Sequence, residues 1–194
     1  MSRRLPCLAL GLMLAAPAAV AAEPPRGVAE VASATFVLGC AAHVGALDKL
    51  HDRLQPGGDL YLPRLPEAAA KPFLQGRPGE AYIRDEAGVT LALVPSDDQC
   101  AVFVRRVAAN AINAQVEKDL KAAVGRYFTV QPGGRDTKGA LTSRFIDLVP
   151  TQTYREELLK KHGREPSGLR VIVTTSESAN PDLQAIITIG LREP

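Results

Sequence analysis

The chain of 194 residues carries 23 basic and 21 acidic residues, and the two signs balance once Arg3 and Arg4 near its start are set aside. With no Trp and 5% aromatic residues, it offers neither the basic stripe nor the stacking platforms of nucleic-acid-binding proteins. We therefore expect no nucleic-acid partner. The length suits one domain with a sizeable core.

Residues 1–22 have the pattern of a cleaved secretory signal peptide. A basic start is followed by an apolar stretch from Leu5 to Leu14 and by small residues that allow cleavage after Ala21 or Ala22. No cysteine lies at the cleavage site for lipid attachment, and no later run of about 18 uncharged apolar residues could span a bilayer. We expect residues 23–194 to form one soluble periplasmic domain of a Gram-negative bacterium, without a membrane span or lipid anchor.

Cleavage there leaves two of the three cysteines, Cys40 and Cys100. In an oxidising compartment the two thiols are expected to form a disulfide, because the sequence lacks the close CxxC spacing of redox and zinc sites. Such a bond closes a loop of about 60 residues, which the chain-entropy treatment credits with roughly 4 kcal/mol.

The first half of the chain predicts helices followed by a meander. Apolar residues at steps of three and four predict one helix from Gly27 to Gln55, with Cys40 on its buried face. A short helix is predicted from Pro66 to Leu74. Three apolar runs separated by turn formers then predict antiparallel strands; they are Glu80–Arg84, Val89–Val94 and Cys100–Val107.

The second half alternates helices and strands. We expect helices at 108–125 and 153–163, the second with a capping box formed by Thr153 and Glu156. Strands are expected at 127–130, 141–149, 169–175 and 183–191. The order α-βββ-α-ββ-α-ββ predicts an α+β domain, with a mostly antiparallel sheet of about five to seven strands and two longer helices packed on it.

No catalytic residue, metal ligand or cofactor site is predicted. His43 and His51 lack the HExxH arrangement and flank the apolar stripe, so we interpret both as solvated or boundary residues. The loop 133–139 is rich in glycine but lacks the Walker A order, which favours a plain hairpin tip. No serine lies in a GxSxG or Ser-x-x-Lys context.

Arg105 is the side chain that we select as a candidate binding residue. It follows an apolar strand on the side of Phe103, where a charge must reach water or pair with an anion or carboxylate. If a pocket lies beside the sheet, Arg105 is expected to be its polar anchor. The alternative is a structural ion pair at a strand end.

Three segments carry a resemblance. They are Phe36 with Cys40, the segment Pro72–Tyr82, and the segment Cys100–Arg105. In these segments the chain resembles a family of small exported proteins and lipoproteins of proteobacteria with no established activity. Many relatives carry a lipobox, which is absent here, and Tyr82 stands where tryptophan is expected. The resemblance implies export and a disulfide-linked α+β domain, and it transfers no catalytic residue.

Three classes of function stay open. The absence of catalytic motifs favours a binding or interaction module, such as an inhibitor, an immunity-like protein or an envelope accessory factor, whose partner is another periplasmic or envelope protein. The alternatives are a hydrolase or a small-ligand carrier with a site dispersed through the sequence. A pocket with converging polar groups would favour the enzyme, and an exposed apolar patch would favour an obligate partner.

Overall fold

The computed structural model describes residues 27–163, 166–177 and 183–192, so the predicted signal peptide lies outside the described residues. Within these ranges the chain forms five α-helices and a seven-stranded antiparallel sheet. The helices are α1 (Val28–Thr35), α2 (Leu47–Leu54), α3 (Glu67–Leu74), α4 (Ala109–Val124) and α5 (Gln152–His162). The strands are β1 (Glu80–Arg84), β2 (Val89–Val94), β3 (Gln99–Val104), β4 (Phe128–Lys138), β5 (Leu141–Pro150), β6 (Leu169–Ser176) and β7 (Ala185–Leu191). The prediction of an α+β domain with an antiparallel sheet is confirmed.

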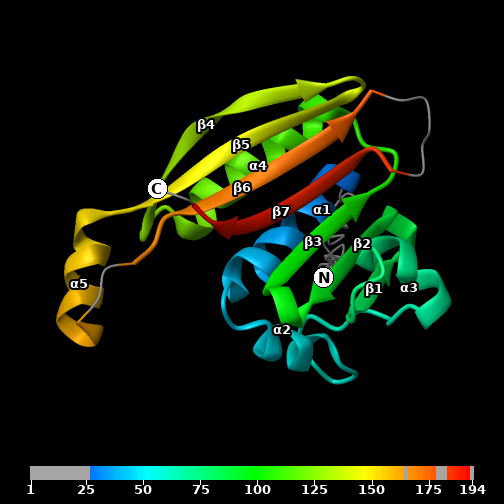
Figure 1. Cartoon of the computed structure of the whole chain (residues 1–194), viewed down its shortest axis with the longest axis horizontal. Helices are drawn as coiled ribbons and strands as arrows, with labels where there is room; N and C mark the ends of the chain where they lie inside the picture. The colour runs from blue at the N-terminus through cyan, green and yellow to red at the C-terminus, as the bar shows by residue number, and fades with distance from the viewer. Residues whose placement is uncertain (1–26, 164–165, 178–182, 193–194) are drawn as a thin grey trace, which may run out of the picture.

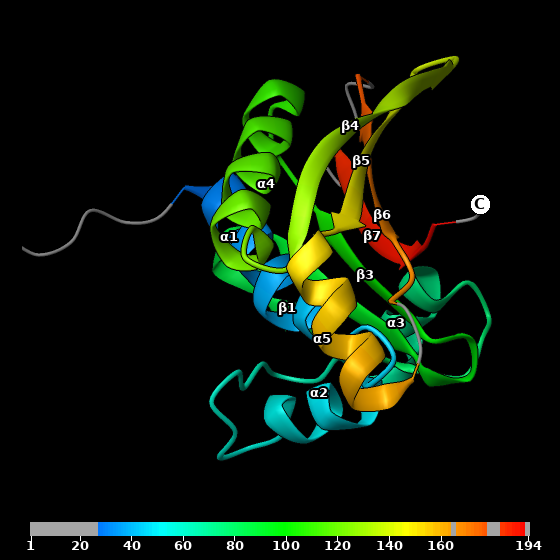
Figure 2. The same ribbon diagram turned by 90° about the vertical axis from the view of Figure 1, so that its left-hand side faces the viewer.

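The sheet order is β1-β2-β3-β7-β6-β5-β4, and helices cover its two faces unequally (Figures 1 and 2). α1 and α4 lie on one face, where Leu91 and Val102 belong to the main core. α3 lies on the opposite face over β1 and β2, where Ala81 and Ala92 join a second, smaller core. Because β2 is buried on both faces, its apolar character at nearly every position is explained.

The predicted continuous helix from Gly27 to Gln55 is wrong. α1 passes into a π-helical turn, Phe36–Cys40, and then a 3-10 turn that ends at His43. The chain reverses at Gly45, whose φ of 74° is in the left-handed region that favours glycine, and α2 begins two residues later. The apolar periodicity continues across the break because both helical segments pack on the same core.

The predicted disulfide is confirmed. Cys40, the last residue of the π-helical turn, is bonded to Cys100 of β3, and their Cα atoms are 5.3 Å apart. Both residues are buried in the main core. The bond therefore ties the first helical layer to β3 of the sheet.

Two predictions in the second half are corrected. The glycine-rich segment 133–139 is not a hairpin loop, because β4 continues to Lys138 with a bulge between Pro132 and Gly134. Proline and a bulge are the features that protect an edge strand from further pairing. α5 is capped by Thr151, whose hydroxyl accepts a hydrogen bond from the Tyr154 amide, and not by the predicted Thr153. α5 projects away from the sheet in Figure 1.

An ion network joins β5, β6 and the end of β7. The buried Asp147 carboxylate accepts hydrogen bonds of 2.7 and 3.1 Å from Arg170, and Arg192 Nε lies 3.5 Å from it. Hydrogen bonding to Arg170 holds the pKa of the Asp147 carboxyl below its usual range. The network therefore stabilises the fold when Asp147 is ionised.

None of the helices in the described part of the chain combines the length and apolar character needed to cross a bilayer.

Candidate functional site

Arg105 and His43, two of the candidate residues in the sequence, are both engaged in internal contacts. Arg105 Nη2 donates a 3.0 Å hydrogen bond to Asp85 in the turn before β2, which is the ion pair considered as the alternative. A role of Arg105 in ligand binding stays a prediction. The interpretation of His43 as solvated or boundary is wrong, because His43 is 7% exposed; its Nδ1 donates to the Gly39 carbonyl at 2.7 Å and its Nε2 accepts from Arg53 at 3.0 Å.

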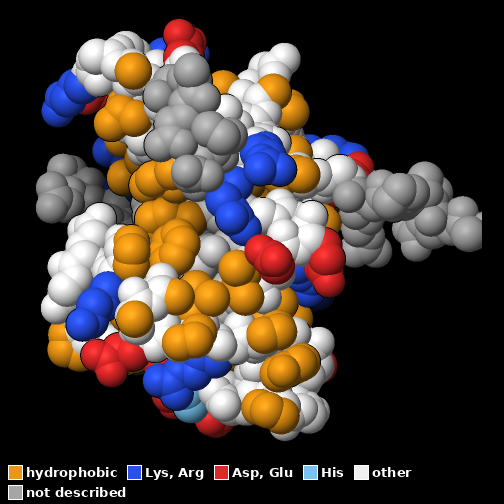
Figure 3. Space-filling view, turned by 90° about the vertical axis from the view of Figure 1, so that its right-hand side faces the viewer, with side chains coloured by type: hydrophobic (Ala, Val, Ile, Leu, Met, Phe, Trp, Pro, Cys, Tyr) orange, Lys and Arg blue, Asp and Glu red, His pale blue; other side chains and the backbone are white. Residues whose placement is uncertain are grey.

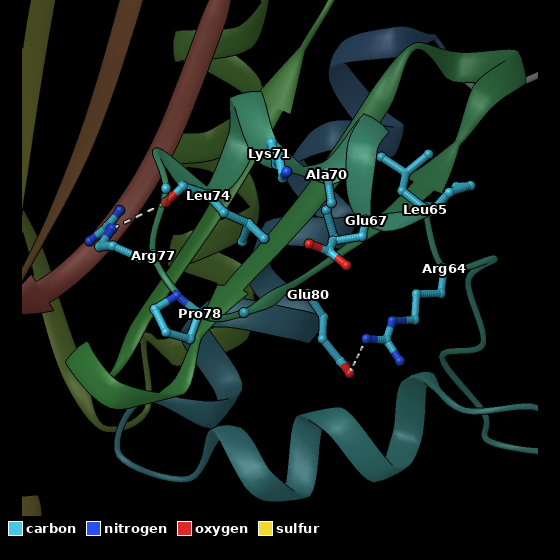
Figure 4. Close-up of a pocket in the computed structure, with 13 residues that line it drawn as sticks. Arg64, Leu65, Glu67, Ala70, Lys71, Leu74, Arg77, Pro78 and Glu80 are labelled. Atoms are coloured by element: carbon cyan, nitrogen blue, oxygen red, sulfur yellow. Dashed lines mark hydrogen bonds and ion pairs between the residues drawn. The ribbon is translucent and has the colours of Figure 1, made fainter.

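A groove of about 820 Å³ lies between α3 and the start of β1, and we call it the α3–β1 groove (Figure 4). Its apolar lining comes from Leu65, Ala70 and Leu74. Charged side chains of both signs surround these residues; they are Arg64, Glu67, Lys71, Arg77 and Glu80. The arrangement resembles the apolar centre and polar rim of a protein interface.

The segment Pro72–Tyr82, on which the family resemblance rests, forms much of this groove. α3 ends at Gln75 in the left-handed conformation with φ of 52°, and the chain then turns sharply through Gly76 into β1. A Cβ atom on Gly79 would lie 2.2 Å from the Leu93 carbonyl oxygen. Only glycine allows the chain to enter β1 this close to β2, so backbone geometry explains part of the motif.

Arg77 holds this turn in place from the other side. Its Nη1 donates a 3.0 Å hydrogen bond to Asp97, and it also contacts the side chain of Gln99. Its Nε donates to the Leu74 carbonyl at 3.3 Å, one of the last carbonyl groups of α3. The Arg77 guanidinium is therefore a structural clamp between the α3 end and the turn before β3, and it is not free to bind a ligand.

Glu80 is the centre of a polar cluster beside the groove. Its Oε1 is 2.9 Å from Arg64 Nη2, and its Oε2 lies 3.1 Å from His51 Nε2. The Tyr82 hydroxyl donates a 2.5 Å hydrogen bond to the same Oε2 and accepts one of 3.2 Å from Gln55. Figure 4 shows Arg64 and Glu80 pointing toward one another below α3.

The burial of this cluster sets its electrostatics. Tyr82 is 1% exposed, and burial, together with its hydrogen bond to Glu80, raises the pKa of the Tyr82 hydroxyl far above its usual range. The hydroxyl is therefore neutral at every physiological pH and serves as a fixed donor. The Glu80 carboxylate, 20% exposed, has its oxygens directed at three neighbours and is consequently held in one orientation.

The cluster contains half of a catalytic arrangement. A histidine oriented by a carboxylate is the base of hydrolytic triads. His51 Nε2 lies 3.1 Å from Glu80 Oε2 and also 3.1 Å from Gln55 Nε2, and its other ring nitrogen, Nδ1, is 3.6 Å from Asp52 Oδ1. Ser96 lines the same adjoining hollow of about 420 Å³ as His51. Its hydroxyl, however, donates to Asp97 at 3.0 Å, so the contact between nucleophile and base is not formed.

No group of three or more His, Cys, Asp or Glu side chains within the described ranges is placed to hold a metal ion. Comparison with family models, curated proteins and solved structures found no match.

No pattern in the sequence predicts that the residues of the Glu80 cluster lie together. Its members come from α2, from the extended segment before α3 and from β1, and Arg64 reaches β1 through a single bridge with Tyr82. The segment Pro72–Tyr82 was the one signal in the sequence that pointed to this part of the molecule.

Proposed function

We propose that this protein is an exported, periplasmic binding module that holds a segment of another periplasmic or envelope protein in the α3–β1 groove. It would act as an inhibitor, an immunity-like protein or an envelope accessory factor. The observation that carries the proposal is the composition of the groove: an apolar lining from Leu65, Ala70 and Leu74 inside a rim of charges of both signs.

Two rim charges support a partner of mixed charge. Among the described residues, Glu67 and Lys71 have no ion-pair partner, whereas Arg64 is paired with Glu80 and Arg77 with Asp97. Opposite charges that are free at a rim steer and orient a partner more than they add affinity. Figure 3 views the side of the molecule that carries α3, where hydrophobic side chains gather between charged side chains of both signs.

Two independent features support a periplasmic location. The first 22 residues have the pattern of a signal peptide, and the Cys40–Cys100 disulfide fits an oxidising environment. Membership of the exported proteobacterial family that the chain resembles belongs to the same proposal.

The test is site-specific photo-crosslinking in the periplasm of the native bacterium. A photoreactive residue in place of Glu67 is expected to form a discrete adduct with one envelope or periplasmic protein. The same residue in place of Lys118, which is exposed on α4 across the sheet, is the matched control. If both positions give the same adducts or neither gives any, the groove is not the interface.

The second candidate function is a hydrolase, favoured by the contact between His51 and Glu80 and by Ser96 in the same hollow. A fluorophosphonate probe that labels the native protein and fails to label Ser96→Ala would support it. Equal labelling of a Ser33→Ala variant as a control is required, because Ser33 is buried and bonded to Asp119.

A further inference from the structure

A second cleft opens beside the π-helical turn Phe36–Cys40, away from the α3–β1 groove. It has a volume of about 170 Å³, and the loop that follows α2 forms its other wall. Leu54 and Leu91, each 1% exposed, form its buried lining, whereas Leu38 and Tyr61 are 52% and 49% exposed. We call it the π-turn cleft.

The size of the π-turn cleft limits what it can hold. An apolar cavity of about 150 Å³ accepts benzene. A cleft slightly larger than that, with five leucine side chains among its lining residues, accommodates a phenyl- or branched-alkyl-sized group. It is too small for a helix or for several residues of a peptide chain.

The local backbone presents this surface. π-helical turns are rare and are found frequently at functional sites. Of the five residues in this turn, four are buried and only Leu38 is exposed. An exposed leucine beside an exposed tyrosine forgoes the burial that the other four residues of this turn achieve, which is expected where the pair contacts a ligand.

The charged side chains of the π-turn cleft determine which charge a ligand must carry. Asp59 and Arg84 are the charged side chains that line the cleft. Asp59 is held by Arg53 through hydrogen bonds of 2.9 and 2.6 Å, and these bonds hold the pKa of its carboxyl below the usual range. Arg84, at the end of β1, has no side-chain partner among the described residues. The charge left for a ligand is therefore positive.

We propose that the π-turn cleft binds a small free carboxylic acid, with its phenyl- or branched-alkyl-sized body between Leu38 and Tyr61 and its carboxylate on the guanidinium of Arg84. The bidentate match between guanidinium and carboxylate supplies the orientation. This site is separate from the α3–β1 groove, so the two proposals stand or fall independently.

The test is titration of the ¹⁵N-labelled full-length mature protein with 3-phenylpropanoate and with its uncharged amide. At typical efficiencies per atom, a ligand of this size binds with a Kd of about 1 mM. We expect amide shifts confined to Leu38, Gly39, Tyr61 and Arg84, and an affinity at least about fivefold higher for the acid than for the amide, as a charge-assisted hydrogen bond implies.

Arg84→Gln is expected to remove the preference for the acid and keep a well-dispersed spectrum, since Arg84 is exposed. Arg135→Gln, on the exposed β4, is the matched control and should bind as the wild type does. Absence of shifts at 10 mM, equal affinity for acid and amide, or an unchanged preference in Arg84→Gln would each overturn the proposal. A peptide ending in leucine that binds more than tenfold tighter than the free acid would overturn it in favour of a protein C-terminus.

Discussion

Removing the disulfide is the sharpest test of how this fold is held together. Cys40 and Cys100 are separated by 60 positions, and closing a loop of that length lowers the entropy of the unfolded chain by an amount worth about 4 kcal/mol at 25 °C. Since domains of this size unfold with roughly 5–15 kcal/mol, the bond supplies a large share of stability. With a urea m-value of about 2 kcal/mol/M, Cys40→Ala/Cys100→Ala should lower the urea midpoint by about 2 M.

The assay is equilibrium urea unfolding followed by circular dichroism. A reductant should lower the midpoint of the wild type toward that of the double variant and leave the variant itself unchanged. The single variant Cys40→Ser should expose a reactive Cys100 thiol on unfolding and be at least as destabilised. A midpoint shift below about 0.5 M would refute the reasoning, because it would mean that the bond does not restrict the unfolded chain.

Three further changes test the ion network and the groove. Because the pKa of the Asp147 carboxyl is lower in the folded than in the unfolded chain, the ionised carboxylate stabilises the fold above the unfolded value near 4, and this stabilisation is lost as the pH falls through the folded value. Asp147→Asn should therefore lower the free energy of unfolding by about 1–3 kcal/mol at pH 7. The difference from wild type should be smaller at pH 3. Gly79→Ala should cost about 2 kcal/mol or more because of its clash with the Leu93 carbonyl, whereas Gly190→Ala, with open space around it, should stay within about 0.5 kcal/mol by urea unfolding. Tyr82→Phe removes the hydroxyl bonded to Glu80 and should lower the free energy of unfolding by about 1–2 kcal/mol in the same assay. An unchanged free energy of unfolding would show that the Glu80 cluster is not cooperative.

The meander was predictable because its signals are local. β1 and β2 have the predicted bounds, and each is bounded by turn formers that form 3-10 turns closing at Gly88 and Asp98 in the left-handed conformation. The disulfide was predictable for a different reason, since only two cysteines follow the predicted signal peptide. In both cases the decisive information lies within a few residues or in a simple count.

The errors come from tertiary packing that overrides local patterns. The apolar stripe from Phe36 to Leu54 runs through the break at Gly45 because both sides of the break bury side chains in one core. The glycines before Lys138 resemble a loop, yet pairing with β5 extends them as a bulged strand. The Glu80 cluster was not predictable, because His51, Arg64 and Glu80 meet only when three separate elements are placed.

The proposal that a partner protein occupies the α3–β1 groove is tested most directly by native mass spectrometry of the protein gently purified from the periplasm, with Lys71→Glu and the control Lys118→Glu compared in parallel. We predict a mature chain lacking its two thiol hydrogens and bound to a second protein in the wild type and in Lys118→Glu, with that complex lost in Lys71→Glu. A bare monomer in all three samples, or a complex that survives Lys71→Glu unchanged, would contradict this account of the groove.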